Sequence, residues 1–177
     1  MPELLPNLGY SDPLKTEIIN GVIYDMASGT FEHAEAVSNT MAILNAFFTG
    51  KHCKPFTSEL EICLDPENVY RPDISVICDF SKRRRNGYYG APALVIEVLS
   101  PSTASHDHNE KFDNYEKYGV TEYLLINPEY LMVEQYILVD GVYKLNAIHI
   151  KRGTKFESRV FEGLVFELDT IFEYRQE

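Results

Sequence analysis

The stretch ALVIEVLSPST, residues 93–103, places one carboxylate in a run that otherwise has the character of a buried strand. Six of its first seven residues are apolar, and the exception is Glu97. Apolar side chains on both faces are typical of a strand at the centre of a sheet. An ionised carboxylate in that position costs several kcal/mol unless a cation, a metal ion or a raised pKa offsets the cost. The fold must therefore bring a partner to Glu97.

A second carboxylate, Asp73, stands at the preceding apolar strand, YRPDISVIC. Pro72 before it marks a strand start or a bulge, because proline donates no ladder hydrogen bond. Two carboxylates that converge from neighbouring strands repel one another unless a cation lies between them. Mg²⁺, or Mn²⁺ in its place, suits this arrangement because it binds through one or two carboxylates and keeps several waters. We expect Asp73, Glu97 and the backbone carbonyl of Val98 to hold such an ion.

The segment SHDHNEKFDNYEKYG, residues 105–119, predicts a helix that ends at its glycine. One face of this helix carries four residues at helical spacing, namely Asp107, Lys111, Tyr115 and Tyr118. Lys111 can then reach over the end of the sheet toward Glu97, with Asp107 and Tyr115 as accessory residues. The alternative is an ordinary surface pair between Asp107 and Lys111, worth a few tenths of a kcal/mol.

Turn and cap residues predict the remaining elements. Asn20-Gly21 and Asp140-Gly141 each favour a two-residue hairpin turn, in residues 16–26 and 132–150. Residues 30–48 predict a helix with Thr30 as its N-cap, and its apolar stripe includes His33, a further accessory candidate.

Residues 55–64 predict one alternating strand, and the C-terminal region a strand followed by a short helix. The expected fold class is α/β (α+β), with a central mixed β-sheet flanked by helices and an added β-hairpin.

Length and cysteine usage indicate the domain organisation and the environment. The 177 residues suit one compact domain over residues 1–177, and we expect residues 1–12 to be flexible. No apolar run approaches the length that crosses a bilayer, so no membrane partner is expected. The cysteines are Cys53, Cys63 and Cys78. Their odd number and the lack of a CxxC spacing predict reduced thiols in a cytoplasmic protein.

The net charge of −11 argues against broad, nonspecific binding of nucleic acid, because phosphate contacts need a positive surface. It does not exclude a local basic patch, and the segment SKRRRNG, residues 81–87, supplies one. A solvated loop is the alternative interpretation of that segment.

Three segments together resemble the Uma-two family of restriction-endonuclease-like proteins: YRPDISVI, ALVIEVLSPSTASHDHNEKFDNYEKYGVTEYLLINP and RVFEGLVFEL. The similarity covers nearly the whole chain, from the Asn20-Gly21 hairpin to the C-terminal helix. This family is similar to the PD-(D/E)-x-K nucleases, and the resemblance implies their fold, with a metal site at one end of the sheet. It also implies that Asp73 is the PD aspartate and Glu97 the second acidic residue.

The resemblance departs from the wider superfamily at the third residue. The superfamily carries a lysine two residues after the acid, where this chain has Leu99. The family resemblance therefore points to Lys111 on the helix. The acid found on the first helix of many members has no match, because Glu32 and Glu35 are expected to face away.

The resemblance implies a metal-dependent DNA endonuclease, in which Lys111 orients a water or stabilises charge on the phosphate. A nuclease-fold protein without cleavage activity, acting as a binding or regulatory module, is the alternative. Cutting both strands in one encounter needs two active sites, so we expect a homodimer. The hairpin around Asp140-Gly141 offers Tyr136, Ile137 and Val139 for its interface.

Overall fold

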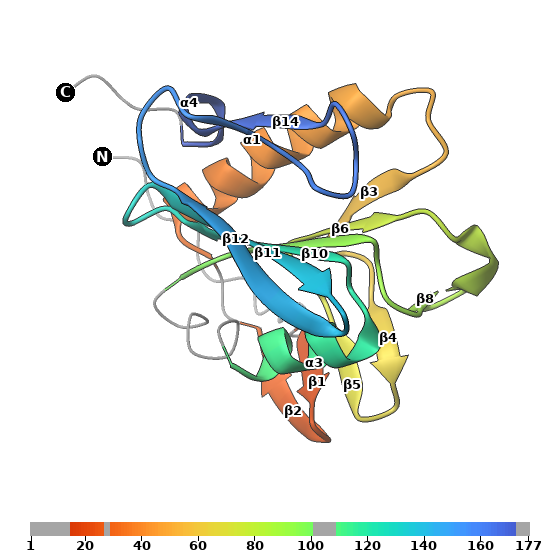
Figure 1. Cartoon of the computed structure of the whole chain (residues 1–177). Coiled ribbons are helices and arrows are strands. Elements are labelled where there is room, and N and C mark those ends of the chain that lie inside the picture. Colours follow the sequence, from red (N-terminus) through yellow and green to blue (C-terminus); the bar gives the residue numbers. More distant parts are fainter. Residues whose placement is uncertain (1–14, 27–28, 101–108, 173–177) are drawn as a thin grey trace, which may run out of the picture.

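The structure, a computed structural model, describes residues 15–26, 29–100 and 109–172 (Figure 1). A six-stranded mixed sheet, called here the central sheet, has the order β12-β11-β10-β9-β6-β3. Its strands are β3 (Lys54–Thr57), β6 (Ile74–Ile77), β9 (Leu94–Val98), β10 (Glu122–Asn127), β11 (Met132–Val139) and β12 (Val142–His149). Strands β9 and β10 are parallel, and the other neighbours are antiparallel.

A second six-stranded sheet has the order β2-β1-β5-β4-β8-β7. Its strands are β1 (Thr16–Ile19), β2 (Val22–Asp25), β4 (Ile62–Asp65), β5 (Asn68–Tyr70), β7 (Arg83–Arg84) and β8 (Gly87–Tyr89). Strands β13 (Lys155–Glu157) and β14 (Val165–Glu167) form a separate ribbon. The helices are α1 (Phe31–Phe48), the 3₁₀ helix η1 (Phe80–Lys82), α3 (Glu110–Tyr118) and α4 (Leu168–Ile171).

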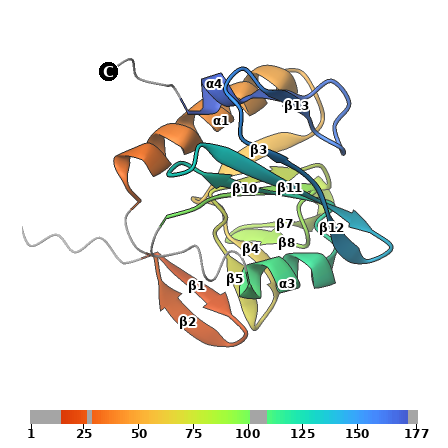
Figure 2. The same ribbon diagram turned by 60° about the vertical axis from the view of Figure 1, so that its left-hand side comes forward.

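Helices cover both faces of the central sheet, as the sequence predicts. Figure 2 shows α1 and α4 on one side of the sheet and α3 on the other. Strand β9 alternates between the two layers. Leu94, Ile96 and Val98 belong to the apolar cluster under α1, whereas Val95 and Leu99 belong to the cluster under α3. Glu97 lies on the α3 face, where its side chain meets that helix.

The turn and cap predictions are confirmed. Asn20-Gly21 and Asp140-Gly141 have positive φ and close the β1–β2 and β11–β12 hairpins. The Thr30 side chain caps α1 by accepting a hydrogen bond from the His33 N–H. The predicted C-terminal strand and helix are β14 and α4.

One strand prediction is wrong. Residues 55–64 form two strands, β3 and β4, in different sheets. The chain turns between them, where the N–H of Leu60 donates to the carbonyl of Thr57 at 3.0 Å. The turn lets the chain leave the central sheet, which alternation alone does not reveal.

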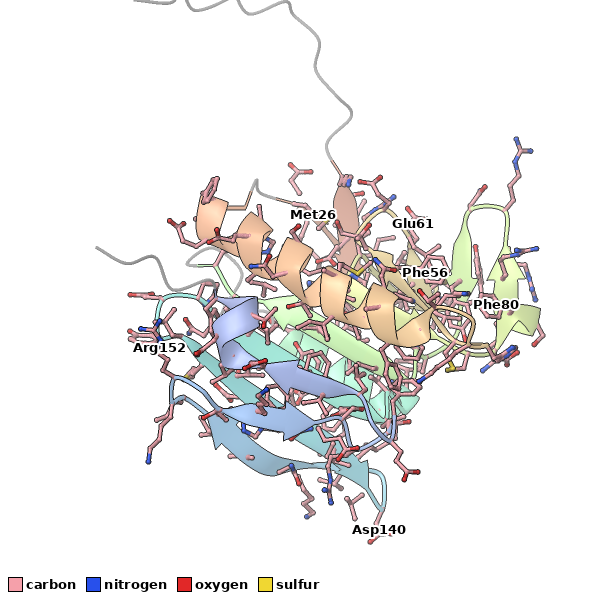
Figure 3. The ribbon with its side chains drawn as sticks, turned by 90° about the horizontal axis from the view of Figure 1, so that it is seen from above. Met26, Phe56, Glu61, Phe80, Asp140 and Arg152 are labelled. Atoms are coloured by element: carbon pink, nitrogen blue, oxygen red, sulfur yellow. A yellow bond between two sulfur atoms is a disulfide. The ribbon has the colours of Figure 1, made fainter. Side chains whose placement is uncertain are left out.

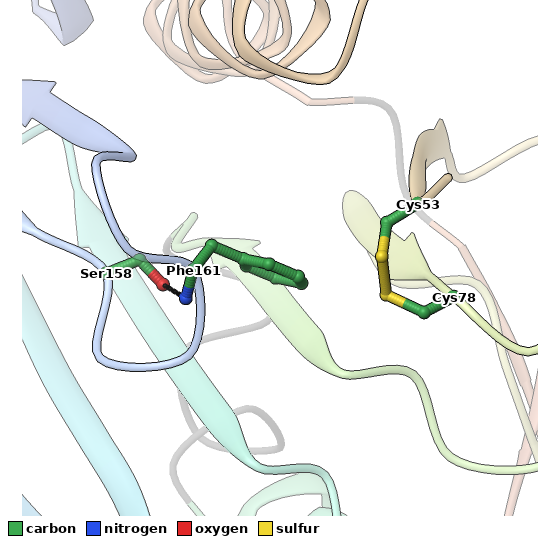
Figure 4. Close-up of a disulfide and its surroundings, with 4 residues drawn as sticks. All are labelled: Cys53, Cys78, Ser158 and Phe161. Atoms are coloured by element: carbon green, nitrogen blue, oxygen red, sulfur yellow. Dashed lines mark hydrogen bonds between the residues drawn. A yellow bond between two sulfur atoms is a disulfide. The ribbon is translucent and has the colours of Figure 1, made fainter. Parts of the chain in front are cut away.

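The prediction of three reduced thiols is also wrong. Cys53 and Cys78 form a disulfide with their Cα atoms 4.2 Å apart, and Cys63 is free (Figure 4). Lys54 pairs with Ile77 across β3 and β6, so the two cysteines occupy the next position along the same pair of strands. Register between distant strands, rather than spacing, brings them together.

Some predictions fall on residues that the structure does not describe. Residues 1–12 lie outside the described ranges, and so do Asp107 and the expected start of the helix before α3. Within the described residues, no helix combines the length and apolar character needed to cross a bilayer.

Candidate active site

Asp73 and Glu97 face each other across two antiparallel strands. Ile74 on β6 pairs with Ile96 on β9, so Asp73 comes opposite Glu97 at the end of β6. The backbone N–H of Asp73 donates to Glu97 Oε2 at 3.1 Å. The N–H of Val98 donates to Asp73 Oδ2 at 2.8 Å. Each carboxylate is thus bound to the backbone of the strand opposite, which fixes the pair at this end of the sheet.

Helix α3 brings two donors to Glu97. Glu97 is 2% exposed. Its Oε1 accepts a hydrogen bond from the Tyr115 hydroxyl at 3.0 Å and lies 3.3 Å from Lys111 Nζ. Lys111 and Tyr115 are four residues apart and therefore project from one face of the helix. Lys111 is 5% exposed, so its ammonium group is buried rather than solvated.

A further carboxylate, Glu17 on β1, lies closer to Lys111 than Glu97 does. Lys111 Nζ is 2.9 Å from Glu17 Oε2. Glu17 Oε1 accepts a hydrogen bond from the backbone N–H of Arg71 at 2.7 Å. Glu17 is not among the site residues predicted from the sequence. Alternation in TEII places it on the face of Ile19, which is buried, and that pattern could have identified it.

His33 approaches Asp73 from the first turn of α1. Its Nε2 lies 3.2 Å from Asp73 Oδ2. Gly29 leaves space for the ring, because a Cβ at that position would lie 2.6 Å from His33 Nδ1. Both His33 and Asp73 line an open groove of about 590 Å³, which α1 borders together with Thr57 and Ser58. The described residues that line this groove include neither lysine nor arginine.

The site keeps Tyr115 protonated. Burial raises the pKa of Tyr115 well above its ordinary value, and the charges of Glu97 and Glu17 add to the effect. Its hydroxyl therefore acts as a hydrogen-bond donor to Glu97 at any physiological pH. Leu99, where the wider superfamily has lysine, is buried beside Tyr115 in the apolar cluster under α3. The Tyr118 hydroxyl donates to Asp65, outside the Glu97 site.

The donor set suits a metal ion bound largely by water. Within the described residues, no group of three or more His, Cys, Asp or Glu side chains surrounds a common metal position. Asp73 Oδ1 accepts no hydrogen bond from these residues, whereas Oδ2 accepts the N–H of Val98. Among the described residues of the site, the carboxylates at 17, 73 and 97 outnumber the lysine at 111. These features fit Mg²⁺ or Mn²⁺, which need few protein ligands.

Comparisons with known proteins agree with this architecture. The family model Uma2, described as "Putative restriction endonuclease", matches residues 3–169. The uncharacterized protein slr1290 of Synechocystis is 32% identical over 160 residues, covering 89% of this chain and 83% of that protein. The uncharacterized protein sll1609 of the same organism is 31% identical over 126 residues, covering 69% of this chain and 71% of that protein.

A solved structure has the same fold. It is a crystal structure from Anabaena variabilis described as "a putative nuclease belonging to DUF820". The TM-score is 0.74 at 21% sequence identity, and the match covers 89% of each chain. The restriction-endonuclease-like fold predicted from the sequence is therefore confirmed.

Proposed function

The chain belongs to the Uma2 family, and from this premise we propose that it is a metal-dependent endonuclease that hydrolyses phosphodiester bonds in DNA. The observation that carries the proposal is the constellation of Asp73, Glu97 and Lys111. Two carboxylates from adjacent strands each accept a backbone N–H of the strand opposite, Asp73 lines an open groove, and a buried lysine contacts Glu97.

The residues have separable roles in this proposal. Asp73 and Glu97, with the carbonyl of Val98, would hold Mg²⁺ or Mn²⁺, which would polarise the phosphodiester and lower the pKa of an attacking water. Lys111 stabilises the buried charge of Glu97 and supplies positive charge toward the phosphate. Tyr115 orients Glu97 through its hydroxyl. His33 orients Asp73 from the groove side.

A second function, binding of nucleic acid without cleavage, is favoured by one observation. Lys111 Nζ is almost fully buried between Glu17 and Glu97, so its charge is already neutralised within the protein. In that case the constellation stabilises the fold, and the protein is a binding or regulatory module of the nuclease fold.

A cleavage assay separates the two functions. Plasmid, single-stranded DNA and RNA are incubated with the pure protein and Mg²⁺ or Mn²⁺, with EDTA as the metal-free control. The endonuclease proposal expects metal-dependent cleavage of DNA that is lost in Asp73→Asn. Absence of cleavage on every substrate, in the presence of intact binding, supports the module instead.

Metal binding has its own measurement. Millimolar Mn²⁺ or Mg²⁺ is expected to raise the melting temperature of the parent protein by mass action. Asp73→Asn is expected to remove the shift. Asp140→Asn is the matched control, because it makes the same chemical change at an exposed hairpin turn. A shift that survives in Asp73→Asn contradicts the assignment.

The proposal includes a homodimer acting on DNA in the cytoplasm. Strand β12 is an edge of the central sheet. Its outward apolar residues and their neighbours are at least 44% exposed, namely Val139, Val142, Leu145, Ile148 and Ile150. Of the predicted interface residues, Tyr136 instead packs its ring on Phe112 at a centroid distance of 5.0 Å. Light scattering at micromolar concentration tests the dimer, and a monomer there contradicts it.

A further inference from the structure

A run of four consecutive cations lies at one end of the second sheet. Lys82 ends η1, Arg83 and Arg84 form β7, and Arg85 occupies the turn before β8. All four are exposed, although the whole chain carries a net charge of −11. We call residues 79–89 the basic hairpin.

The charges of the basic hairpin are largely uncompensated. Several cations elsewhere meet carboxylates, as in Arg71–Glu61 at 2.6 Å, Lys155–Glu167 at 3.2 Å and Arg152–Asp169 at 3.8 Å. Among the described residues, only Lys82 of the hairpin does so, with Asp79 at 3.7 Å.

The three arginines of the hairpin have no carboxylate partner within the described part of the chain. Arg84 donates from Nη1 to the backbone carbonyls of Ser81 and Arg83. The side chains of Arg83 and Arg85 form no hydrogen bond or ion pair with the described residues. Three guanidinium groups are therefore available to an external anion.

Contacts of β8 hold the basic hairpin in the second sheet. Tyr88 is 3% exposed and its N–H donates to the carbonyl of Glu61 at 2.8 Å. A Cβ at Gly87 would lie 2.8 Å from the same carbonyl oxygen, so only glycine permits this close approach. Strand β8 continues in parallel with β4. The arginines consequently have a defined position on the molecule.

Two sets of contacts fix that position relative to the candidate active site. Glu61 binds the Arg71 guanidinium, and the backbone N–H of Arg71 binds Glu17, the partner of Lys111. On the other side, the His52 ring lies 5.6 Å from the Phe80 ring, just before β3 leads to the groove. Figure 3 shows Glu61, Phe56 and Phe80 on the same side of the molecule, away from Arg152 and Asp140.

We propose that the basic hairpin binds the sugar–phosphate backbone of the nucleic acid that enters the groove. This proposal rests on the proposed function. The groove offers no lysine or arginine of its own among its described lining residues, so a phosphate chain needs compensation from nearby. Arginine recognises phosphate oxygens through paired N–H donors. Tyr89, half exposed beside the arginines, offers a ring on which an unpaired base can stack.

The test compares two variants of equal net charge. Arg83→Ser/Arg84→Ser/Arg85→Ser removes the arginines of the hairpin. Lys144→Ser/Lys151→Ser/Arg159→Ser removes three exposed cations elsewhere, and each variant changes the net charge from −11 to −14. Binding of a labelled 30-base-pair duplex is measured by fluorescence anisotropy in EDTA over a range of salt concentrations, so that cleavage plays no part.

The hairpin variant is expected to bind roughly 10- to 100-fold more weakly at low salt. Its slope of log K against log salt should decrease by up to about 2.7, since each phosphate contact contributes about 0.9. The control variant is expected to change affinity by no more than about threefold. Equal losses in the two variants, or no measurable duplex binding by the parent, overturn the proposal.

The readout also distinguishes this proposal from the endonuclease proposal and from a membrane partner. If the parent protein cleaves no substrate but the hairpin variant loses DNA affinity, the DNA-binding role of the basic hairpin is supported and the endonuclease proposal is not. If both variants cleave DNA equally well and with unchanged affinity, the endonuclease proposal is supported and the DNA-binding role of the basic hairpin is overturned. If the hairpin arginines are needed for sedimentation with vesicles that contain anionic lipid, and DNA affinity is unchanged in the hairpin variant, the proposal is overturned in favour of a membrane surface.

Discussion

Two buried glutamates on neighbouring strands of the central sheet are accommodated in different ways. Glu97 near the end of β9 is 2% exposed, and Glu122 at the start of β10 is fully buried. They lie on opposite faces, because Glu97 meets α3 whereas Glu122 meets Ser158 in the β13–β14 connection. Burial of a carboxylate is therefore common to both ends of the sheet and does not by itself identify an active site.

The donors differ at the two positions. Glu97 has a lysine, a tyrosine hydroxyl and a backbone N–H. Glu122 accepts from the Gln135 amide at 2.7 Å, the backbone N–H of Arg159 at 3.1 Å and the Ser158 hydroxyl. Within the described residues, no cationic side chain pairs with Glu122. Neutral donors are sufficient for a structural carboxylate. The carboxylate to which we assign a function instead pairs with a lysine and lies opposite Asp73, which lines the groove.

The largest effect is expected from Lys111→Met, which keeps the aliphatic stem and removes the charge. Glu17 and Glu97 are then buried together without a cation, and loss of one partner of a buried pair costs about 3–5 kcal/mol. Urea unfolding measures that loss, and cleavage is expected to fall by roughly 10²-fold or more. Adding Glu17→Gln should recover part of the stability and none of the rate. Cleavage by Lys111→Met at the parental rate would show that Lys111 has only a structural role.

Tyr115→Phe removes the hydroxyl donor to Glu97 and keeps the ring. A hydrogen bond to a charged group contributes about 1.5–3 kcal/mol, so the free energy of unfolding should fall by that amount. The activity should fall as well, because Glu97 loses its orientation. Tyr143→Phe is the matched control, since its hydroxyl donates to the carbonyl of Val120, away from the site. An equal loss of activity in both variants contradicts the role of Tyr115.

Glu122→Gln tests the other buried glutamate, to which we assign only a structural role. Ser158 Oγ already accepts the N–H groups of Val160 and Phe161, the latter shown in Figure 4. A glutamine amide facing that oxygen leaves the serine hydroxyl proton without an acceptor. The expected loss is about 1–3 kcal/mol of stability, with cleavage unchanged at a temperature where the variant is folded. Loss of metal-dependent cleavage in this variant would contradict a purely structural Glu122.

The smallest effect concerns pH. His149 Nε2 contacts Gln135, the amide that binds Glu122, and burial lowers the pKa of His149 below its ordinary value of 6.5. As the pH falls below about 6.5, the unfolded chain takes up the proton first, so the free energy of unfolding falls until the lower folded-state pKa is passed. His149→Asn should remove this dependence. Unfolding measured from pH 7.5 to 4.5 in both proteins checks it, and identical profiles contradict the assignment.

The core of the site follows from the sequence because its residues obey local periodicities. Glu97 interrupts a short apolar strand, Asp73 begins the previous one, and Lys111 and Tyr115 share one helical face. The fold follows from the same alternation and turn residues, and from the family resemblance.

The remaining features depend on contacts between distant segments. Glu17 lies in a strand of only four residues, and its lysine comes from α3 on the far half of the chain. Glu122 begins its strand, a position that is ordinarily solvent-accessible, and its donors come from residues 135, 158 and 159. The turn that takes the chain from β3 in the central sheet to β4 in the second sheet likewise depends on pairing with distant strands. Local patterns carry no information on these pairings.

A reductant in the buffer decides which covalent form of this protein is studied. With dithiothreitol all three cysteines are thiols, and without it the chain carries the Cys53–Cys78 bond, at a mass lower by a pair of hydrogen atoms. The bond joins the ends of β3 and β6, and β3 carries Thr57 of the groove wall while β6 follows directly on Asp73. Intact mass should therefore be measured together with every rate, because samples of identical sequence can differ in a covalent bond between the two strands that lead to the groove residues Thr57 and Asp73.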